Sequence, residues 1–138
     1  MTNPILAKVL RYVVVEAETG CWRWTGGFSQ SGRRGCFYPN MRVGGARAKG
    51  GRVWRVNRLV LTFATVPRLP GESLAAYLQR AILDRAPWEA AHTCDHSYCV
   101  NPGHLQWESH PENVQQQARR RAVARRQQTA QQAEEAVA

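Results

Sequence analysis

The first residues of the chain place apolar and polar side chains in a pattern that is typical of a helix. Asn3 can cap a helix with its side chain, and Pro4 suits the first helical position, where its missing N–H costs nothing. Apolar residues then recur at intervals of three and four, as one helical face requires: Ile5, Leu6, Val9, Leu10 and Val13. We therefore predict that residues 1–19 are helical and that Gly20 ends the helix.

Residues 21–53 follow a different pattern, in which short aromatic and β-branched segments are separated by glycine, proline and asparagine. This punctuation predicts a small antiparallel sheet. A β-ribbon that carries arginines fits the DNA major groove, so the basic residues of this region predict a DNA-binding surface: Arg33, Arg34, Arg42, Arg47, Lys49 and Arg52. For any single one of them, a solvated charged face is the alternative.

Two further stretches have helical periodicity and are predicted to be packing elements of residues 54–86. Apolar residues from Val53 to Thr65 lie on one helical face, and Ser73 can cap a second helix that reaches about Arg85.

A strand is predicted at residues 88–93, and a capping box formed by Ser109 and Glu112 predicts the start of a C-terminal helix. Its apolar residues are mainly alanine and valine, so we expect this helix to be solvated, to lie along DNA or to pair with another subunit. Arg119 and Arg120 are its foremost candidates for DNA contact.

Charge and length limit the class of protein. Lysine and arginine outnumber aspartate and glutamate by 19 to 10, and all but Lys8 and Lys49 of the cations are arginine, which favours phosphate and guanine edges. A GC-rich genome is the alternative source of this bias.

The length fits one domain, residues 1–138, with a core that needs a metal staple. No apolar run approaches the roughly 18 residues that span a bilayer, and no signal-peptide pattern is present. We therefore expect a soluble protein with no membrane partner, in the cytoplasm of a bacterial or phage-infected cell or in a eukaryotic nucleus.

In such a reducing compartment, cysteines are expected to be metal ligands or buried thiols rather than disulfides. Cys94, Cys99 and His104 form the pattern C-x4-C-x4-H, bent by Asn-Pro-Gly. This donor set suits tetrahedral zinc, which needs a fourth ligand. Cys21 is the first candidate for that ligand and Cys36 the second, and two buried thiols beside an unrelated histidine are the alternative to a zinc site.

His92 and Asn113 flank this loop and predict a second chemistry. A neutral imidazole is a suitable general base near neutral pH, and a carboxamide oxygen can bind a hard cation such as Mg²⁺. With a phosphate between them, the two groups would form a site for phosphodiester hydrolysis. The alternatives are a redundant histidine of the zinc region and an ordinary helix-start asparagine.

The run from Ala91 to Asn113 has the form H-x-C-x4-C-x-N-P-x-H-L, with an asparagine eight residues after the leucine. It resembles the ββα-metal (HNH) nuclease superfamily, and in particular its His-Cys box homing endonucleases. The resemblance includes the sequence LQWES and is weaker at GCWRWTG, residues 20–26, and at the N-terminal segment. It implies an α+β fold in which a small antiparallel sheet and helices flank a zinc-stapled ββα-metal motif, within residues 88–128.

The resemblance also implies roles for single residues. His92 would be the general base, Asn113 the magnesium ligand, and Asn101 the residue that holds the loop, with zinc bound by Cys21, Cys94, Cys99 and His104. The family places one arginine on the scissile phosphate, for which Arg52 and Arg55 are the candidates here.

Family members cut both DNA strands as homodimers, so a homodimer is the expected assembly. No cysteine or histidine follows His110, however, so a second zinc site of the homing enzymes and its dimer contact have no counterpart, and a nicking monomer is the alternative. His110 itself is expected to contact phosphate or solvent, and a second contact to the cation is the alternative.

The leading hypothesis is a magnesium-dependent, sequence-selective endonuclease that leaves 5′-phosphate and 3′-hydroxyl ends on double-stranded DNA. The alternatives are a zinc-stabilised DNA-binding protein without cleavage activity, and a less specific nicking, restriction or RNA-directed nuclease. The presence of both His92 and Asn113 favours an enzyme, because DNA binding alone needs neither.

Overall fold

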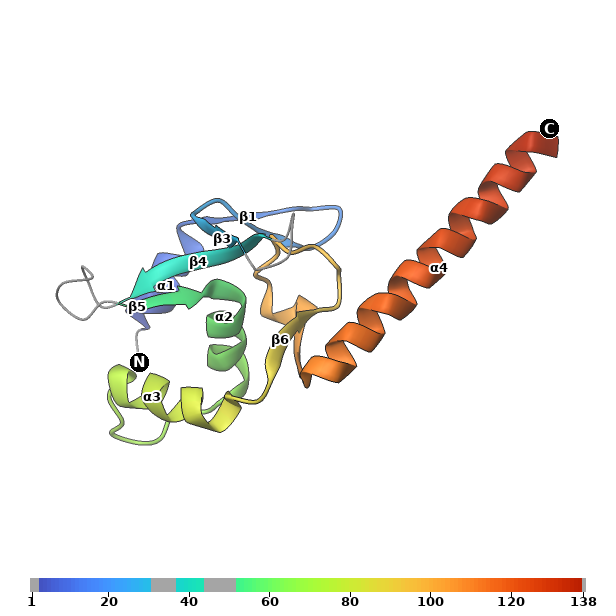
Figure 1. Ribbon diagram of the computed structural model, residues 1–138. Helices are drawn as coiled ribbons and strands as arrows, with labels where there is room; N and C mark the ends of the chain where they lie inside the picture. Colours follow the sequence, from blue (N-terminus) through green and yellow to red (C-terminus); the bar gives the residue numbers. More distant parts are fainter. Residues whose placement is uncertain (1–2, 31–36, 44–51, 138) are drawn as a thin grey trace.

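The structure, a computed structural model, describes residues 3–30, 37–43 and 52–137. These residues form an α+β fold of helices and small antiparallel sheets, as predicted (Figure 1). The described elements follow one another along the chain in this order: α1 (Pro4–Leu10), β1 (Val13–Val15), β2 (Trp22–Trp24), β3 (Phe28–Gln30), β4 (Phe37–Val43), β5 (Arg52–Arg55), α2 (Val56–Thr65), α3 (Leu74–Arg85), β6 (Glu89–His92), the 3₁₀ helix η2 (Pro102–His104), β7 (Leu105–Glu108) and α4 (His110–Val137).

The described strands form three antiparallel sheets: β1 with β2, β4 between β3 and β5, and β6 with β7. In the three-stranded sheet, Met41 lies opposite Trp54, and Asn40 lies opposite Arg55. Alternate residues of a strand face opposite sides, and Met41 and Trp54 belong to the core, so Asn40 and Arg55 lie on the face that points away from it. The antiparallel sheet predicted for residues 21–53 is confirmed for β3, β4 and β5, whereas β2 belongs to a separate hairpin.

The N-terminal helix is shorter than predicted. Asn3 does cap α1, because its Oδ1 accepts from the N–H groups of Ile5 and Leu6 at 3.2 and 3.1 Å, but α1 has only seven residues. The prediction of a helix over residues 1–19 is wrong. Three consecutive valines favour extended backbone, and β2 offers β1 a partner strand. Gly20, with a φ of 74°, lies between these two strands and does not end a helix.

The helix predicted from Val53 to Thr65 begins later, at Val56. The preceding residues pair with β4 as strand β5, and Val53, which was expected on the buried helical face, is 47% exposed. Pairing between strands therefore overrides the helical periodicity at this end. The second predicted helix is confirmed as α3, with Ser73 Oγ accepting from the Ala76 N–H at 3.1 Å.

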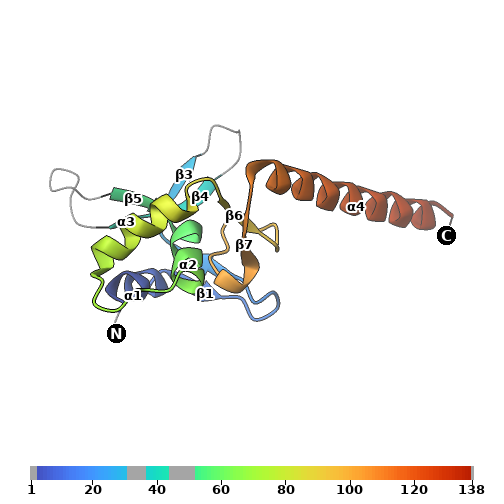
Figure 2. The same cartoon turned by 90° about the horizontal axis from the view of Figure 1, so that it is seen from below.

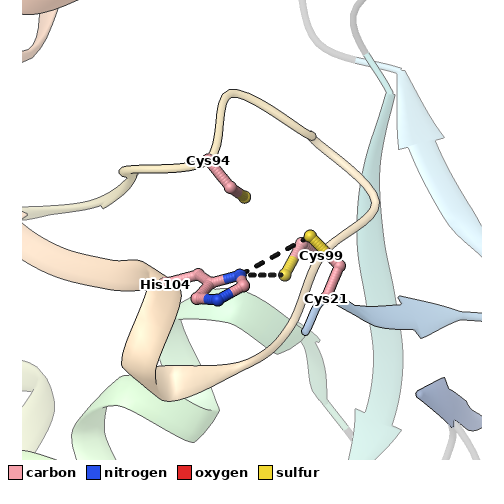
Figure 3. A group of neighbouring side chains, drawn as sticks. All are labelled: Cys21, Cys94, Cys99 and His104. Atoms are coloured by element: carbon pink, nitrogen blue, oxygen red, sulfur yellow. Dashed lines mark hydrogen bonds between the residues drawn. The ribbon is translucent and has the colours of Figure 1, made fainter. Parts of the chain in front are cut away.

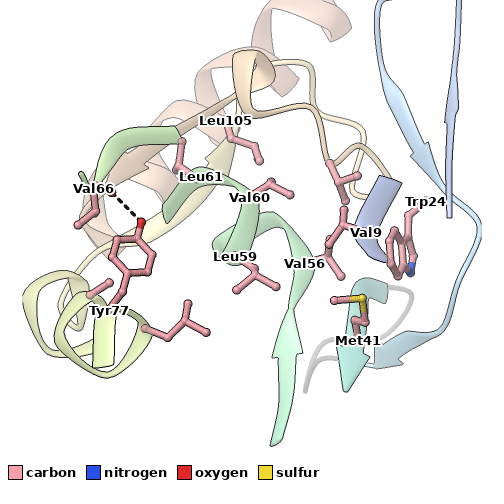
Figure 4. Close-up of a cluster of buried hydrophobic side chains, with 13 residues drawn as sticks. Val9, Trp24, Met41, Val56, Leu59, Val60, Leu61, Val66, Tyr77 and Leu105 are labelled. Carbon is pink, nitrogen blue, oxygen red and sulfur yellow. Dashed lines mark hydrogen bonds between the residues drawn. The ribbon is translucent and has the colours of Figure 1, made fainter. Parts of the chain in front are cut away.

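The hydrophobic core is built around α2 (Figure 4). This helix contacts β4, β5, β6, β7 and η2. Several of its apolar side chains are at most 2% exposed: Val56, Leu59, Val60 and Leu61. Trp24 from β2 and Leu105 from β7 belong to the same cluster. One core therefore joins the N-terminal sheets to the C-terminal part of the chain, which confirms that α2 is a packing element.

Tyr77 attaches α3 to the end of α2. Its hydroxyl lies 2.9 Å from Thr62 O and 2.6 Å from Val66 O, and the residue is 3% exposed.

Tyr77→Phe removes the donor from this buried site, so we expect the free energy of unfolding to fall by about 1–2 kcal/mol. Urea unfolding of the zinc-loaded protein measures this change. Leu83→Ala, at a 75% exposed position, should change it by less than about 0.5 kcal/mol. Equal stability of Tyr77→Phe and the wild type would show that the hydroxyl contributes nothing here.

The helix α4 starts at the predicted capping box. The Ser109 N–H donates to Glu112 Oε2 at 3.2 Å, and the Glu112 N–H donates to Ser109 Oγ at 3.4 Å. Beyond its first turns, α4 projects away from the rest of the chain with mostly exposed side chains (Figures 1 and 2). Among the described residues, no helix combines the length and the apolar composition needed to cross a bilayer.

Candidate functional site

Backbone pairing places the cysteine loop, residues 93–104, against β2. Two hydrogen bonds of 2.8 and 3.0 Å join β2 to the Val100 N–H and the Tyr98 carbonyl of this loop. The loop thus continues the hairpin of β1 and β2 as an added antiparallel edge. Cys21, which directly precedes β2, is brought to the loop cysteines by this pairing.

Four side chains from this region form a candidate metal centre (Figure 3): Cys21, Cys94, Cys99 and His104. Their ligand atoms all lie within 4.8 Å of one another. His104 Nδ1 is 3.5 Å from the sulfur atoms of both Cys21 and Cys99. A tetrahedral zinc ion, with Zn–S of about 2.3 Å and Zn–N of about 2.0–2.1 Å, separates sulfur and nitrogen ligands by about 3.6 Å. The cluster therefore fits a structural zinc ion with Cys21 as its fourth ligand, while Cys36 lies outside the described residues.

Asn101 holds the cysteine loop by side-chain hydrogen bonds to the backbone, as predicted. Its Nδ2 donates to Gly20 O at 2.8 Å, and its Oδ1 accepts from the Gly103 N–H at 2.9 Å. The His104 N–H donates to Asn101 O at 2.9 Å and closes the turn of η2. These bonds fix the direction in which η2 presents His104 to the cysteines.

The protein alone makes the three thiols unequal in acidity. Burial raises the pKa of Cys99 to about 12 and raises the pKa of Cys94. Burial also opposes ionisation of Cys21, but hydrogen bonds from His96 and Thr19 outweigh it and lower the pKa of Cys21 to about 6. The Nδ1 atom of His96 lies 3.3 Å from the Cys21 sulfur. A bound zinc ion would stabilise all three thiolates, because coordination deprotonates a thiol.

The cysteine loop also fixes the imidazole of His92. Its Nε2 lies 2.9 Å from the carbonyl oxygen of Cys99. A carbonyl can only accept, so this contact places a proton on Nε2 and leaves Nδ1 as the acceptor of the neutral ring. Burial lowers the pKa of His92, which favours that neutral form. The residue lines a cavity of about 280 Å³ together with Arg120 and Arg121.

Asn113 lines a neighbouring cavity of about 260 Å³. Its Nδ2 donates to Glu89 Oε2 at 2.8 Å, and its Oδ1 accepts from Gln117 Nε2 at 3.2 Å. Tyr38 and Gln117 line both cavities. The two cavities share these two lining residues and both border α4, and together they are named the helix groove here. The predicted base and the predicted magnesium ligand therefore line adjoining parts of one groove, not the wall of a single cavity.

The strand β6 and the helix α4 run side by side along the helix groove. Asn113 contacts Glu89 at one end of β6, and at the other end Arg120 Nη2 donates to His92 O at 3.0 Å. Three strand residues rise about 10 Å and seven helical residues rise about 10.5 Å, so contacts at both ends are compatible with two straight elements. His92 and Asn113 thus lie toward opposite ends of this pair of elements, and Gln117 lines both cavities.

Alternation along β5 separates the two arginines that were candidates for the scissile phosphate. Arg55 lines the 260 Å³ cavity, and its guanidinium carbon is 4.8 Å from the ring centroid of Tyr38. Arg52 lies 4.7 Å from the ring centroid of Trp54 and lines an apolar groove beside α3. The structure therefore brings Arg55, but not Arg52, to the helix groove.

No family model, no curated protein and no solved structure matches this chain. A small α+β fold can carry many activities, so a function has to be inferred from the residues of the metal centre and the helix groove.

The other predicted DNA-binding residues lie in different surroundings. Arg119 is exposed on α4, and Arg42 is half-buried on the outer face of β4. Arg120 is engaged within the protein, because its Nε lies 2.7 Å from Asp95 Oδ1 and it also binds His92 O. This residue therefore joins α4 to the cysteine loop. Four predicted contacts lie outside the described residues: Arg33, Arg34, Arg47 and Lys49.

Several residues that line the helix groove were missed from the sequence, among them Tyr38, Asn57, Glu89 and Gln117. Gln117 follows Asn113 by four positions, which places both on one face of a helix, and this spacing was an available signal. Glu89 is a lone carboxylate on the predicted strand, with no pattern around it. Tyr38 reaches the groove through the packing of β4, and no pattern in the neighbouring sequence indicates this position. His110, which was expected to meet phosphate or solvent, is exposed, and its Nδ1 lies 2.8 Å from Glu89 Oε1.

Proposed function

We propose that this protein is a sequence-selective endonuclease that hydrolyses phosphodiester bonds of double-stranded DNA. The observation that carries the proposal is the fixed imidazole of His92, whose Nε2 donates to Cys99 O while the side chain lines the helix groove. An imidazole held in one tautomer suits a general base better than a redundant histidine of a zinc region. Arginines along the same groove supply positive charge for a phosphate.

In the proposed reaction, the scissile phosphate lies in the helix groove between His92 and Asn113. His92 takes a proton from water as the water oxygen forms a bond to phosphorus. The bond between phosphorus and the 3′ oxygen breaks, and the 3′ oxygen takes a proton from solvent, which leaves a 5′-phosphate and a 3′-hydroxyl. Arg55 is the proposed contact to the phosphate. A magnesium ion bound at Asn113 would supply stabilisation of the negative charge on the leaving oxygen.

The outer face of the three-stranded sheet is the proposed surface that reads DNA. It carries Tyr38, Asn40 and Arg42 on β4 and Arg55 on β5. Tyr38 also lines the helix groove, so the proposed reading surface adjoins the proposed cutting site. A β-ribbon fits the width of the major groove. The exposed Arg119 on α4 is available for the phosphate backbone.

A cleavage selection tests the proposal. The zinc-loaded protein with Mg²⁺ is expected to cut a preferred sequence from a library of randomised duplexes. Asn113→Ala should lower the rate about a hundredfold or more, because it removes a group that stabilises developing charge. Gln115→Ala, which removes an exposed carboxamide from the same helix, is the matched control and should cut at the wild-type rate.

Two other outcomes lead to different functions. Tight binding of duplex DNA without any cleavage would favour the DNA-binding protein over the enzyme. Cleavage without a preferred site would favour a less specific nuclease. The predicted homodimer stays a prediction, because a single chain does not test it.

A further inference from the structure

Glu89 occupies the Asn113 end of the helix groove and is the one acidic residue of the described chain that lines the 260 Å³ cavity. One carboxylate oxygen lies 2.8 Å from His110 Nδ1, and the other accepts from Asn113 Nδ2 at 2.8 Å. A carboxylate therefore lies within hydrogen-bond distance of the predicted magnesium ligand.

A buried amide oxygen of a residue that lines the same cavity has no hydrogen-bond partner among the described residues. Asn57 lines this cavity and is 4% exposed. Its Nδ2 donates to Ala90 O at 3.2 Å, which fixes the orientation of the amide, because an amide oxygen there would face another acceptor. Its Oδ1 accepts no hydrogen bond from the described residues. Buried polar atoms are almost always satisfied in folded proteins, so this oxygen points to a ligand that the described residues do not supply.

A second carboxylate lies across the β6–β7 hairpin from Glu89. Glu108 is its direct cross-strand partner and is 3% exposed, and its Oε2 finds no hydrogen-bond partner in the part of the chain that the structure describes.

We propose that Glu89 is a carboxylate ligand of a divalent cation in this cavity, with the Oδ1 atoms of Asn57 and Asn113 as further ligands. His110 donates to Glu89 and orients the carboxylate, as residues behind a metal ligand commonly do. The amide of Asn113 turns so that its oxygen, in place of Nδ2, meets the cation. A carboxylate and two amide oxygens, with water or phosphate at the remaining positions, are a donor set that Mg²⁺ accepts.

The arginines of the cavity set the conditions for binding. Arg58 donates to the carbonyl groups of Trp88 and Arg85, and Arg55 stacks on Tyr38. Both positive charges weaken cation binding to the free protein, and a bound phosphate would offset them. The inference rests on the proposed function for the purpose of the cation, whereas cation binding itself does not require cleavage.

Manganese binding tests the inference on the full, zinc-loaded chain. Titration with Mn²⁺, with the free ion followed by electron paramagnetic resonance, should reveal one site in addition to the zinc centre. Glu89→Gln is expected to weaken this binding about tenfold or more, and Asn113→Asp to strengthen it about tenfold, because affinity follows the number of charged ligands. Glu112→Gln is the matched control, since glutamine can replace glutamate in a capping box, and should bind Mn²⁺ like the wild type.

The stability of the variants is checked by zinc content and thermal unfolding. Should Glu89→Gln fold poorly, Glu89→Asp keeps the charge, shortens the side chain and is again expected to bind Mn²⁺ more weakly. Wild-type affinity in both variants overturns the inference.

Cleavage assays separate this inference from the proposed function. If Mn²⁺ binds and depends on Glu89 but no duplex is ever cut, the cation site stands and the nuclease is wrong. If DNA is cut and the Mg²⁺ concentration for half-maximal cleavage is the same in the wild type and Glu89→Gln, the nuclease stands and Glu89 is not a ligand.

Discussion

Removal of zinc is expected to abolish the cooperative unfolding transition of this protein. A structural zinc site contributes about 10–16 kcal/mol in zinc-finger peptides, whereas a whole domain is stable by about 5–15 kcal/mol. Val100 and Leu105, on either side of η2, belong to the main hydrophobic core. Loss of the metal should therefore disturb the packing around α2 as well as the cysteine loop. Thermal unfolding with and without a chelator, followed by circular dichroism, measures the effect.

Cysteine variants show which residues hold the metal. Elemental analysis of the wild type is expected to give one zinc ion per chain. Cys99→Ser should lose zinc and the cooperative transition, because it removes a buried ligand of the cluster. Cys36→Ser is the matched control and should keep both, since Cys21 completes the set of four. Zinc loss in Cys36→Ser together with zinc retention in Cys21→Ser would reverse this assignment.

Most of the metal centre could be predicted from the sequence because its ligands are local. Cys94, Cys99 and His104 lie within one short loop, and the turn residues between them indicate that the chain folds back. The fourth ligand depends on pairing between β2 and that loop, which is a tertiary contact. Spacing alone therefore left Cys21 and Cys36 as alternatives.

The N-terminal elements were harder to predict, because tertiary pairing decides them. Val13 fits a helical stripe and a strand equally well, and β2 as its partner selects the strand. The same holds for Val53, which pairs opposite Arg42. Because β5 is a strand, alternate side chains point to opposite faces, and Arg55 and Arg52 are therefore separated. A helix predicted to begin at Val53 does not indicate this separation.

The helix groove combines local and distant information in a similar way. The capping box at Ser109 predicts where α4 begins, and hence that Asn113 lies in its first turns. The sequence does not give the direction in which α4 leaves the hairpin. Side-by-side packing of α4 and β6 sets Glu89 against Asn113 and Arg120 against His92. This packing is also the reason that the base and the asparagine lie at different points along the groove.

His92→Ala is expected to lower the rate of DNA cleavage by about a hundredfold to ten-thousandfold, as is typical for the loss of a general base. Zinc content and DNA affinity should persist, because the imidazole is not among the four clustered metal ligands. Single-turnover cleavage of a selected duplex measures the rate, and gel-shift titration measures the affinity. Thr93→Ala, at the exposed neighbouring position, should cut like the wild type.

Chemical rescue separates a base from a structural residue. The space left by His92→Ala adjoins the 280 Å³ cavity, so free imidazole can enter there and accept the proton of water. Added imidazole should raise the cleavage rate of His92→Ala and leave that of Asn113→Ala unchanged. A His92→Ala protein that cuts at the wild-type rate would remove His92 as the base. Loss of zinc from this variant would instead mean that the Cys99 carbonyl and the imidazole hold the cysteine loop together, which is a structural role.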